Sequence, residues 1–217
     1  MEKVTVPITI TIPVGPHPQN TRWLGECLLS IVEQTVMPDE VLLIDNGAHL
    51  DPSTLPHLPI RIYTMPWTAS IAHAFNCGVA LARNDLVIML GSDDKLFPDC
   101  VRTCWASWQR MQDPHGYYAM TVEYDDGRLQ NDPCNAAMVH KALWNLTGGF
   151  PIEAAIGACD TWLISKIMIG GGGNLYHMSE YPTYWYRNHA ETDTRTRAAW
   201  FGIIEQARDL WLRRGTT

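Results

Sequence analysis

Short, strongly apolar runs alternate with segments of helical periodicity through residues 1–95, and this alternation restricts the fold more than any other feature of the sequence. Four of the runs have the aliphatic content of strands: 4–12, 41–44, 60–63 and 86–90. Two segments between them carry apolar residues at helical spacing: 21–34 and 71–82. Repeated strand–helix–strand order predicts right-handed crossovers and a mostly parallel sheet.

Proline and capping residues set the expected limits of these elements. We expect Pro7 to trim the start of the first strand and Pro13 to end it, because proline cannot donate a sheet hydrogen bond. Asn20 or Thr21 is expected to cap the first helix. Ligands of parallel α/β sheets bind outside the carboxyl ends of the strands. The loops after the first, second and fourth strands are therefore expected to be neighbours in space.

The second half of the chain has a different pattern, in which helices and short strands no longer alternate regularly. Helices are expected at 98–111, 140–147, 159–169 and 200–211. Strands are expected at 117–124, 136–139 and 184–186, the last as an edge strand or an extended loop. The Asp-Asp-Gly sequence at 125–127 favours a hairpin turn, and Gly148 is expected to end the helix before it.

Length, charge and cysteine content exclude several classes of protein. With 217 residues, 46% hydrophobic and 18% charged, the chain suits a folded domain and not a disordered tail. A net charge of −7 gives no global positive field to attract nucleic acid or anionic lipid. No apolar run reaches the ~20 residues of a membrane span, and no signal peptide is evident, so a cytoplasmic location is expected. The six cysteines form no Cys-x-x-Cys pair and are expected to be mostly reduced core residues.

Two adjacent acids follow the strand expected at 86–90. Carboxylates of Asp93 and Asp94 in that position would face the ligand crevice, where they could hold Mg²⁺ or Mn²⁺ against a diphosphate. Relief of their mutual repulsion by a cation favours this role over the alternative of a helix cap ahead of Pro98. Asp45 ends the second strand at the same rim. By itself it would be a turn aspartate, but together with Asp93 it outlines a nucleotide site.

An ordered set of short motifs resembles the family 2 glycosyltransferases of the GT-A fold. In chain order the motifs occupy residues 10–14, 30–35, 41–47, 76–78, 90–94, 148–151, 159–162 and 186–189. The resemblance implies an α/β GT-A fold with a Rossmann-like, mostly parallel central sheet flanked by helices and a smaller mixed region on the acceptor side. It also implies a single domain, with a nucleotide-sugar-binding half at 1–95, an acceptor and catalytic half at 96–190, and a C-terminal helix at 191–217.

The same resemblance implies a nucleotide-sugar donor, most often a UDP-sugar, and assigns residues to it. The implied donor-binding residues are Pro13, Val14, Asp45, Asn76, Ser92 and Arg187. Pro13 and Val14 would border the nucleotide, and Asp45 would receive the base, usually a uracil. Arg187 could pair with phosphate oxygens.

Metal binding and catalysis are also implied by the resemblance. Asp93 matches the metal-binding aspartate of the Asp-x-Asp motif with Asp94 in support, whereas Gly91 replaces the first acid of that motif. His189 matches a histidine that contacts the metal or the diphosphate in some relatives, and a solvated loop histidine is the alternative. Asp160 falls where the family carries its catalytic base, and the alternative is an aspartate stabilised by a helix dipole. In an inverting transfer Asp160 would take the proton of the acceptor hydroxyl.

Tryptophan is abundant, and two of the nine tryptophans are candidates for sugar binding. Trp162 and Trp185 could form a platform for a sugar ring, because aromatic faces suit the apolar side of a sugar. Core packing is the alternative for any single tryptophan. The sequence alone leaves both interpretations open.

Three functions stay open on the sequence. The first is an inverting, metal-dependent glycosyltransferase with a glycan or glycoconjugate acceptor. The second is a transferase acting on a hydroxymethylated base in DNA, which the acidic charge balance disfavours. The third is a GT-A domain that binds sugars without catalysis, for which Gly91 is the main support. A dinucleotide-dependent oxidoreductase is disfavoured, because residues 13–18 do not supply Gly-x-Gly-x-x-Gly.

Overall fold

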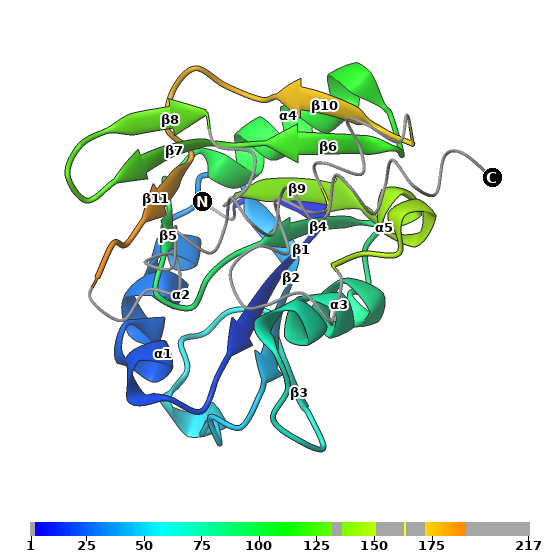
Figure 1. Ribbon diagram of the computed structural model, residues 1–217. Helices are drawn as coiled ribbons and strands as arrows, with labels where there is room; N and C mark the ends of the chain where they lie inside the picture. The colour runs from blue at the N-terminus through cyan, green and yellow to red at the C-terminus, as the bar shows by residue number, and fades with distance from the viewer. Residues whose placement is uncertain (1–2, 132–135, 151–162, 164–171, 190–217) are drawn as a thin grey trace, which may run out of the picture.

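Two sheets organise the molecule, and a computed structural model describes them over residues 3–131, 136–150, 163 and 172–189 (Figure 1). The larger sheet has the strand order β10-β6-β9-β4-β1-β2-β3 and the smaller one β5-β11-β7-β8. The larger sheet contains β1 (Thr5–Val14), β2 (Met37–Asp45), β3 (Ile60–Thr64), β4 (Leu86–Met89), β6 (Gly116–Ala119), β9 (Ala137–His140) and β10 (Asn174–His177). The smaller sheet contains β5 (Lys95–Leu96), β7 (Thr121–Tyr124), β8 (Leu129–Asn131) and β11 (Tyr184–Tyr186).

The larger sheet is mostly parallel, as predicted. Strand β1 runs parallel to β2 and β4, β2 to β3, and β10 to β6. Among the described strands of this sheet, β9 alone runs antiparallel to its neighbours β4 and β6. The carboxyl ends of β1, β2 and β4 therefore meet at one edge, where a ligand of an α/β fold is expected.

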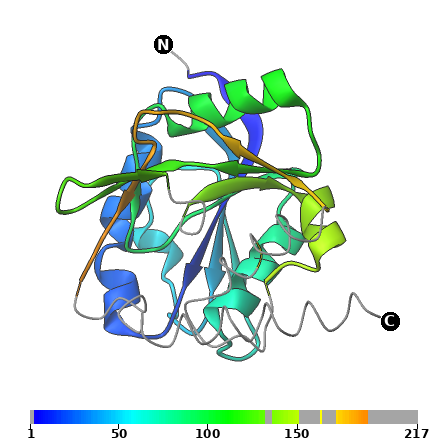
Figure 2. The same ribbon diagram turned by 45° about the horizontal axis from the view of Figure 1, so that its top comes forward.

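Helices cover both faces of the larger sheet (Figures 1 and 2). The helices are α1 (Pro18–Arg22), α2 (Leu24–Val32), α3 (Ile71–Leu81), α4 (Cys100–Met111) and α5 (Lys141–Thr147), with a short 3-10 turn at Pro52–Thr54. Buried side chains of α2 and α4 pack on one face, and those of α3 and α5 pack on the other. Gly78 permits the close approach of α3, because a Cβ there would lie 2.0 Å from Thr11 Oγ1 of β1. The result is a three-layer α/β domain.

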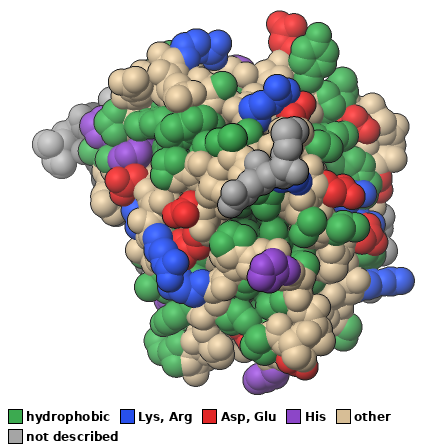
Figure 3. Space-filling view, turned by 180° about the vertical axis from the view of Figure 1, so that it is seen from behind, with side chains coloured by type: hydrophobic (Ala, Val, Ile, Leu, Met, Phe, Trp, Pro, Cys, Tyr) green, Lys and Arg blue, Asp and Glu red, His purple; other side chains and the backbone are tan. Residues whose placement is uncertain are grey.

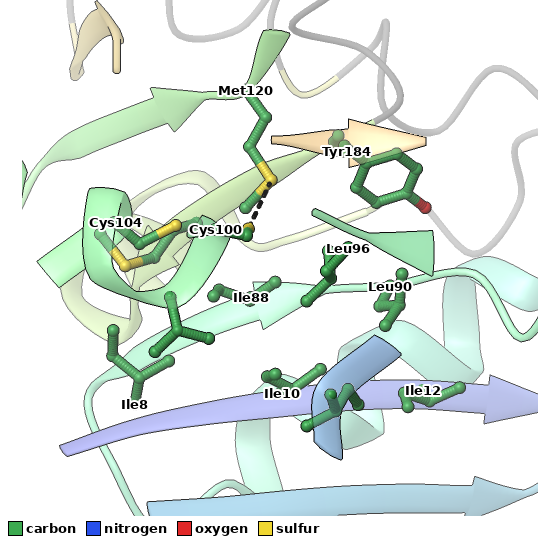
Figure 4. Close-up of a cluster of buried hydrophobic side chains, with 14 of the residues drawn as sticks. Ile8, Ile10, Ile12, Ile88, Leu90, Leu96, Cys100, Cys104, Met120 and Tyr184 are labelled. Carbon is green, nitrogen blue, oxygen red and sulfur yellow. Dashed lines mark hydrogen bonds between the residues drawn. The ribbon is translucent and has the colours of Figure 1, made fainter. Parts of the chain in front are cut away.

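Cysteines lie in or near the core as reduced thiols, as predicted. Cys27, Cys100 and Cys104 are buried, and Cys77 is partly buried. Cys100 and Cys104 of α4 pack beside the aliphatic side chains of β1 and β4 in the largest hydrophobic cluster (Figure 4). The predictions for Cys134 and Cys159 lie outside the described residues, as do those for Asp160, Trp162, the helix at 200–211 and the segment 191–217. Of the helix predicted at 159–169, only Leu163 is described, and it is helical and buried.

The first predicted helix is two helices separated at Trp23, and this part of the prediction was wrong. Trp23 has φ −109° and ψ 3°, which is not helical. The first helix begins at Pro18, where the fixed φ of proline suits the first helical position, so Asn20 and Thr21 lie inside it and do not cap it. The break reorients the chain between α1 and α2.

Both prolines lie inside β1, and neither limits it as predicted. The pairing of β1 with β2 shifts register between Val6 and Thr9, so Pro7 is accommodated by an irregularity in the ladder. Pairing with β4 ends at Thr11, and Leu90 N donates to Thr11 O. Pro13 faces the same edge of β1 as Thr11, beyond the last pair with β4. A backbone N–H group at residue 13 would therefore have no partner in the sheet, so proline is tolerated there.

Several elements of the second half also differ from the prediction. The single strand predicted at 117–124 bends at Met120, so β6 lies in the larger sheet and β7 in the smaller one. Helix α4 begins at Cys100 and not at Pro98. Strand β11 pairs with both β5 and β7 and is not an edge. The sequence analysis did not identify β5 or β10, whereas the hairpin turn around Gly127 is confirmed.

Charged side chains of both signs are interspersed on the face seen in Figure 3, without one large basic patch. None of the helices in the described ranges has the length and apolar content that a membrane crossing needs. The cytoplasmic location and the division of the chain into functional halves stay predictions.

Candidate functional site

The loop between β4 and β5 carries the two adjacent acids and defines the candidate site. We call residues 91–94 the acidic loop. Asp94 N donates to Gly91 O over 3.2 Å, which closes the loop as a turn. The side chain of Asp93 is 30% exposed, whereas Asp94 as a residue is 5% exposed, so the two acids have different surroundings. Ser92 is buried within the loop.

Asp94 serves as a buried acceptor that attaches the acidic loop to β11. Its Oδ2 accepts a hydrogen bond from the Tyr184 hydroxyl at 2.5 Å, and its Oδ1 accepts one from Arg187 N at 2.8 Å. Burial, and next the charge of Asp93, raises the pKa of Asp94 well above its usual range. Both oxygens of Asp94 therefore have protein partners, and its support of a metal, which the resemblance implied, stays a prediction.

Tyr184 links the acidic loop to the hydrophobic core. Its ring packs near Leu90 and Leu96 in the large cluster, and its hydroxyl lies at the edge of that cluster (Figure 4). The hydroxyl also accepts a hydrogen bond from Gly91 N at 3.1 Å. Burial, and next the charge of Asp94, raises the pKa of Tyr184. A core residue thus fixes the conformation of the loop at both ends.

Asp93 and His189 form the exposed part of the site. His189 Nε2 lies 3.0 Å from Asp93 Oδ2, and the two side chains are 14% and 30% exposed, respectively. The residues are 96 positions apart in sequence, so the fold brings together two groups that the sequence analysis predicted separately. A carboxylate oxygen and an imidazole nitrogen at this separation can share a proton or bind the same cation.

The donor atoms of this pair fit a divalent cation. Asp93 Oδ2 and His189 Nε2 lie 3.0 Å apart as a hydrogen-bonded pair, and both atoms are of types that bind divalent cations, so the two residues would hold such an ion together. In the described part of the chain, no three or more His, Cys, Asp and Glu side chains are grouped to hold a metal. Further ligands would therefore come from a diphosphate and water, as is usual for Mg²⁺ bound with substrate phosphates.

Arg187 contacts the acidic loop, α2 and two tryptophans, and it stabilises the backbone of the acidic loop. Its Nε donates to Asp93 O at 2.8 Å, and its Nη2 pairs with Glu26 Oε2 at 2.8 Å. The guanidinium lies 4.8 Å from the ring centroids of both Trp23 and Trp185. Nε and Nη2 of Arg187 thus have protein partners, and the predicted pairing of Arg187 with phosphate oxygens stays a prediction. Trp185 contacts Arg187, and its role in sugar binding likewise stays a prediction.

Packing gives a reason for glycine at position 91, where the family motif has an acid. A Cβ there would lie 2.6 Å from Asp94 Oδ2 and 3.0 Å from Asp93 Oδ1. A side chain at 91 would therefore displace Asp94 from Tyr184. The glycine belongs to the same arrangement as the buried carboxylate of Asp94.

Asp45 shapes the loop after β2, which was the alternative to its predicted contact with a base. Its carboxylate accepts hydrogen bonds from the backbone N–H groups of Ala48, His49 and Leu50 at 2.8, 3.0 and 2.9 Å. The residue is 3% exposed, so the carboxylate is mostly used by the protein. Contact with a nucleobase stays a proposal.

Pro13 and Val14 are buried at the end of β1, beside Asp45. Asn46 N donates to Val14 O at 2.9 Å, and the Asn46 side chain exchanges two hydrogen bonds with the backbone of Ala69. These bonds tie the loops after β1, β2 and β3 together. The predicted proximity of the strand-end loops is confirmed for this part of the rim.

Asn76 joins α3 to the Gly-Gly-Phe loop. Its Nδ2 donates to Phe150 O at 2.8 Å, and its Oδ1 accepts from Phe150 N at 3.0 Å. Gly149 has φ +67°, and a Cβ there would lie 2.6 Å from Asn76 Oδ1, so only glycine suits the position. The amide of Asn76, predicted to lie beside the donor, thus has a structural task.

The structure brings Asp93, Asp94, Arg187 and His189 together, as the resemblance implied, whereas Asp160 lies outside the described residues. Sequence reasoning missed Trp23, which contacts His189 with ring centroids 4.6 Å apart. It also missed Glu26 as the partner of Arg187. The signal for Trp23 was its place between a turn that begins at Pro18 and the first apolar residue of the helical pattern, Leu24.

Comparison with known proteins supports the same family and fold. The profile of glycosyl transferase family 2 matches residues 20–154, more than half of the chain. The O-antigen biosynthesis protein RfbC of Myxococcus xanthus is 35% identical over 103 residues, which cover 42% of this chain and 8% of that protein.

Solved structures of S. aureus TarS share the fold. The complex of TarS 1-349 with UDP-GlcNAc has a TM-score of 0.72 and 13% identity, over 87% of this chain and 60% of that one. The complex with UDP has a TM-score of 0.70 and 14% identity, over 87% of this chain and 62% of that one. This likeness confirms the predicted α/β GT-A fold, and the chain spans about three fifths of those TarS chains.

Proposed function

Because the chain belongs to glycosyl transferase family 2, we propose that it transfers a sugar from a nucleotide-sugar, in the simplest case a UDP-sugar, to a hydroxyl of a glycan or glycoconjugate. The observation that supports this proposal best is the Asp93–His189 pair beyond the carboxyl end of β4. The S. aureus structures with UDP-GlcNAc and with UDP support a uridine diphosphate as the leaving group.

We assign the divalent cation, Mn²⁺ or Mg²⁺, to Asp93 and His189. When bound, such an ion supplies Lewis-acid stabilisation of the charge that develops on the departing diphosphate. Asp94 contributes indirectly, because its bonds to Tyr184 and Arg187 fix the backbone that carries Asp93. Arg187 contributes in the same way through its bond to Asp93 O.

We propose Asp160 as the general base of an inverting transfer. Its carboxylate would take the proton of the acceptor hydroxyl as the oxygen attacks the anomeric carbon and the bond to the diphosphate breaks. The transition state would have oxocarbenium character, so negative charge leaves with the phosphates. Pro13 and Val14 would border the nucleotide at the end of β1. The carboxylate of Asp45 accepts three hydrogen bonds from its own loop, and we propose that it accepts a further one from the base.

The first experiment measures release of UDP from UDP-GlcNAc and related donors, with and without Mn²⁺, for the wild type and Asp93→Asn. We expect metal-dependent release by the wild type and at least a hundredfold loss in the variant. Asp126→Asn, in the exposed turn between β7 and β8, is the control and should keep full activity. Donor binding without release, in the presence of glycan acceptors or DNA containing hydroxymethylated bases, would instead support a sugar-binding module.

A further inference from the structure

We propose that Trp23 is a positioning residue that orients His189 and Arg187 toward Asp93. This inference rests on the proposed function, because it explains how the pair that would hold the cation is kept in place. Trp23 belongs to none of the motifs that carry the family resemblance, and its role follows from contacts between distant parts of the chain.

Trp23 lies at the break between α1 and α2. Trp23 is the non-helical residue at that break, with φ −109° and ψ 3°. Its ring lies 4.6 Å from the His189 ring and 4.8 Å from the Arg187 guanidinium, measured to ring centroids. One side chain therefore contacts both residues of the 187–189 segment that face the acidic loop.

Aromatic and cationic side chains alternate in a stack that includes Trp23. The members, in spatial order, are Arg22, Trp23, Arg187, Trp185 and Lys95. The distances from each cation to the neighbouring ring centroid run from 4.0 to 4.9 Å. Each such contact is attractive, and the attraction is stronger where the cation is partly removed from water, as for Arg187 at 16% exposure.

The stack has a direct consequence for the acidic loop. Glu26, three residues after Trp23 in the first turn of α2, pairs with Arg187 at 2.8 Å. Arg187 in turn donates to Asp93 O. The start of α2 thus supports the acidic loop in two ways. Glu26 of its first turn holds Arg187, which bonds to the backbone of Asp93, and Trp23, just before the helix, contacts the ring of His189.

His189 needs such support because β11 ends at Tyr186. The imidazole lies beyond the hydrogen bonds of the sheet, and its described contacts include Asp93 and Trp23. A ligand whose ring is fixed before the cation binds loses less conformational entropy on binding. Removing the indole should therefore weaken the cation site without removing a ligand atom.

The test compares Trp23→Leu and Trp23→Phe with Trp105→Leu. Trp105 is a tryptophan of α4 that is partly buried like Trp23, and it serves as the matched control. Mn²⁺ binding in the presence of UDP is measured by electron paramagnetic resonance, in the wild-type and His189→Ala backgrounds. The ¹H–¹³C signals of the His189 ring are recorded by NMR without any ligand, and the His189→Ala variant assigns them.

We expect Trp23→Leu to weaken Mn²⁺ binding by roughly three- to tenfold, in line with the usual strength of cation–π and aromatic contacts. Trp23→Phe should recover most of the affinity, and Trp105→Leu should change it little. In the His189→Ala background Trp23→Leu should lower the Mn²⁺ affinity much less, because the imidazole that Trp23 contacts is absent. The His189 ring signals should shift in Trp23→Leu and stay in place in Trp105→Leu.

Wild-type Mn²⁺ affinity in Trp23→Leu would overturn the inference and leave the proposed function intact, whatever the shift of the His189 signals, because loss of the indole ring current shifts them by itself. No Mn²⁺ binding by the wild type, with or without UDP, would contradict the proposed metal dependence, and the NMR comparison would then decide the role of Trp23. If Trp23→Leu does not fold, Trp23→Phe and the nuclear Overhauser contact between the Trp23 and His189 rings in the wild type provide the decision.

Discussion

Two buried carboxylates near opposite ends of β4 have opposite surroundings. Glu40 of β2 is level with the start of β4, because both flank Thr9 of β1, and Glu40 is 1% exposed. It accepts hydrogen bonds at 2.8 Å from Thr9 Oγ1, Arg61 Nε and Arg83 N. Asp94 follows the other end of β4, and its described acceptor bonds come from a tyrosine hydroxyl and one backbone N–H group.

The pKa directions of these two acids express the difference. Burial alone would raise the pKa of Glu40, but the bonds from Arg83, Arg61 and Thr9 together outweigh it and lower that pKa. Burial, followed by the charge of Asp93, raises the pKa of Asp94. Cationic partners at the Glu40 end compensate the charge and stabilise the fold. The negative charge at the Asp94 end is less compensated, which suits a place where a cation arrives with its substrate.

The largest effect on this comparison should come from Glu40→Ala. Removing one member of a buried ion pair costs about 3 kcal/mol, toward the lower limit of such changes because Arg61 is 32% exposed. Urea denaturation measures the free energy of unfolding, with Glu40→Gln as the milder control. A loss below about 1 kcal/mol would show that the amino end of the sheet does not depend on this charge.

Asp93→Asn should give the reverse result at the other end. Activity should fall at least a hundredfold, which corresponds to about 2.7 kcal/mol in the barrier. The free energy of unfolding should change by less than about 0.5 kcal/mol, because the side chain is partly exposed. Steady-state rates measure the activity of the variant, and urea denaturation of the same preparation measures its free energy of unfolding. Equal losses of stability and activity would contradict the contrast between the two ends.

Tyr184→Phe tests whether Asp94 depends on its hydroxyl partner. The variant removes a buried hydrogen bond to a carboxyl group and leaves Gly91 N without its acceptor, so we expect a loss of about 1.5–3 kcal/mol in stability. Tyr181→Phe, at a residue 80% exposed, is the matched control and should change little. Thermal unfolding of both variants measures the difference, and equal melting temperatures would argue against the role of Tyr184.

The smallest effect is the pH dependence contributed by Glu40. Its folded pKa lies below the unfolded value of ~4.3, so its contribution is fully present above pH ~4.3 and is lost as the pH falls through the folded pKa. The amount is about 1.4 kcal/mol for each unit between the two pKa values. Glu40→Gln should lose this part of the acid dependence. An unchanged slope of stability against pH below pH 5 would contradict the assignment.

Local sequence patterns predicted most of the parallel sheet, because each strand of the first half is apolar enough to be recognised without its neighbours. The failures occur where partners from elsewhere in the chain decide the structure. The chain bends at Met120 to pass from the larger sheet to the smaller one. The two residues of β5 form a strand by pairing with β11, and β10 forms one by pairing with β6. The break at Trp23 is another case, since the helix expected at 21–34 ran through it although the apolar spacing begins only at Leu24.

The site shows the same limit. The resemblance identified Asp93 and His189, which the fold places 3.0 Å apart, but it did not separate the surroundings of Asp93 from those of Asp94. Asp93 and Asp94 differ because the turn at Gly91 places one toward solvent and the other toward Tyr184, and neither composition nor spacing contains that information. The partners of Asn76 and Asp45 likewise depend on loops far away or on a turn that forms only in the fold.

In the proposed function, Asp93 and His189 hold the cation that meets the diphosphate. A crystal structure with Mn²⁺ and UDP, with anomalous scattering recorded at the manganese edge, would locate that cation. We expect one anomalous peak in contact with an Asp93 carboxylate oxygen, His189 Nε2 and oxygens of the diphosphate. A peak bound elsewhere, or UDP bound with its diphosphate away from this pair, would contradict it.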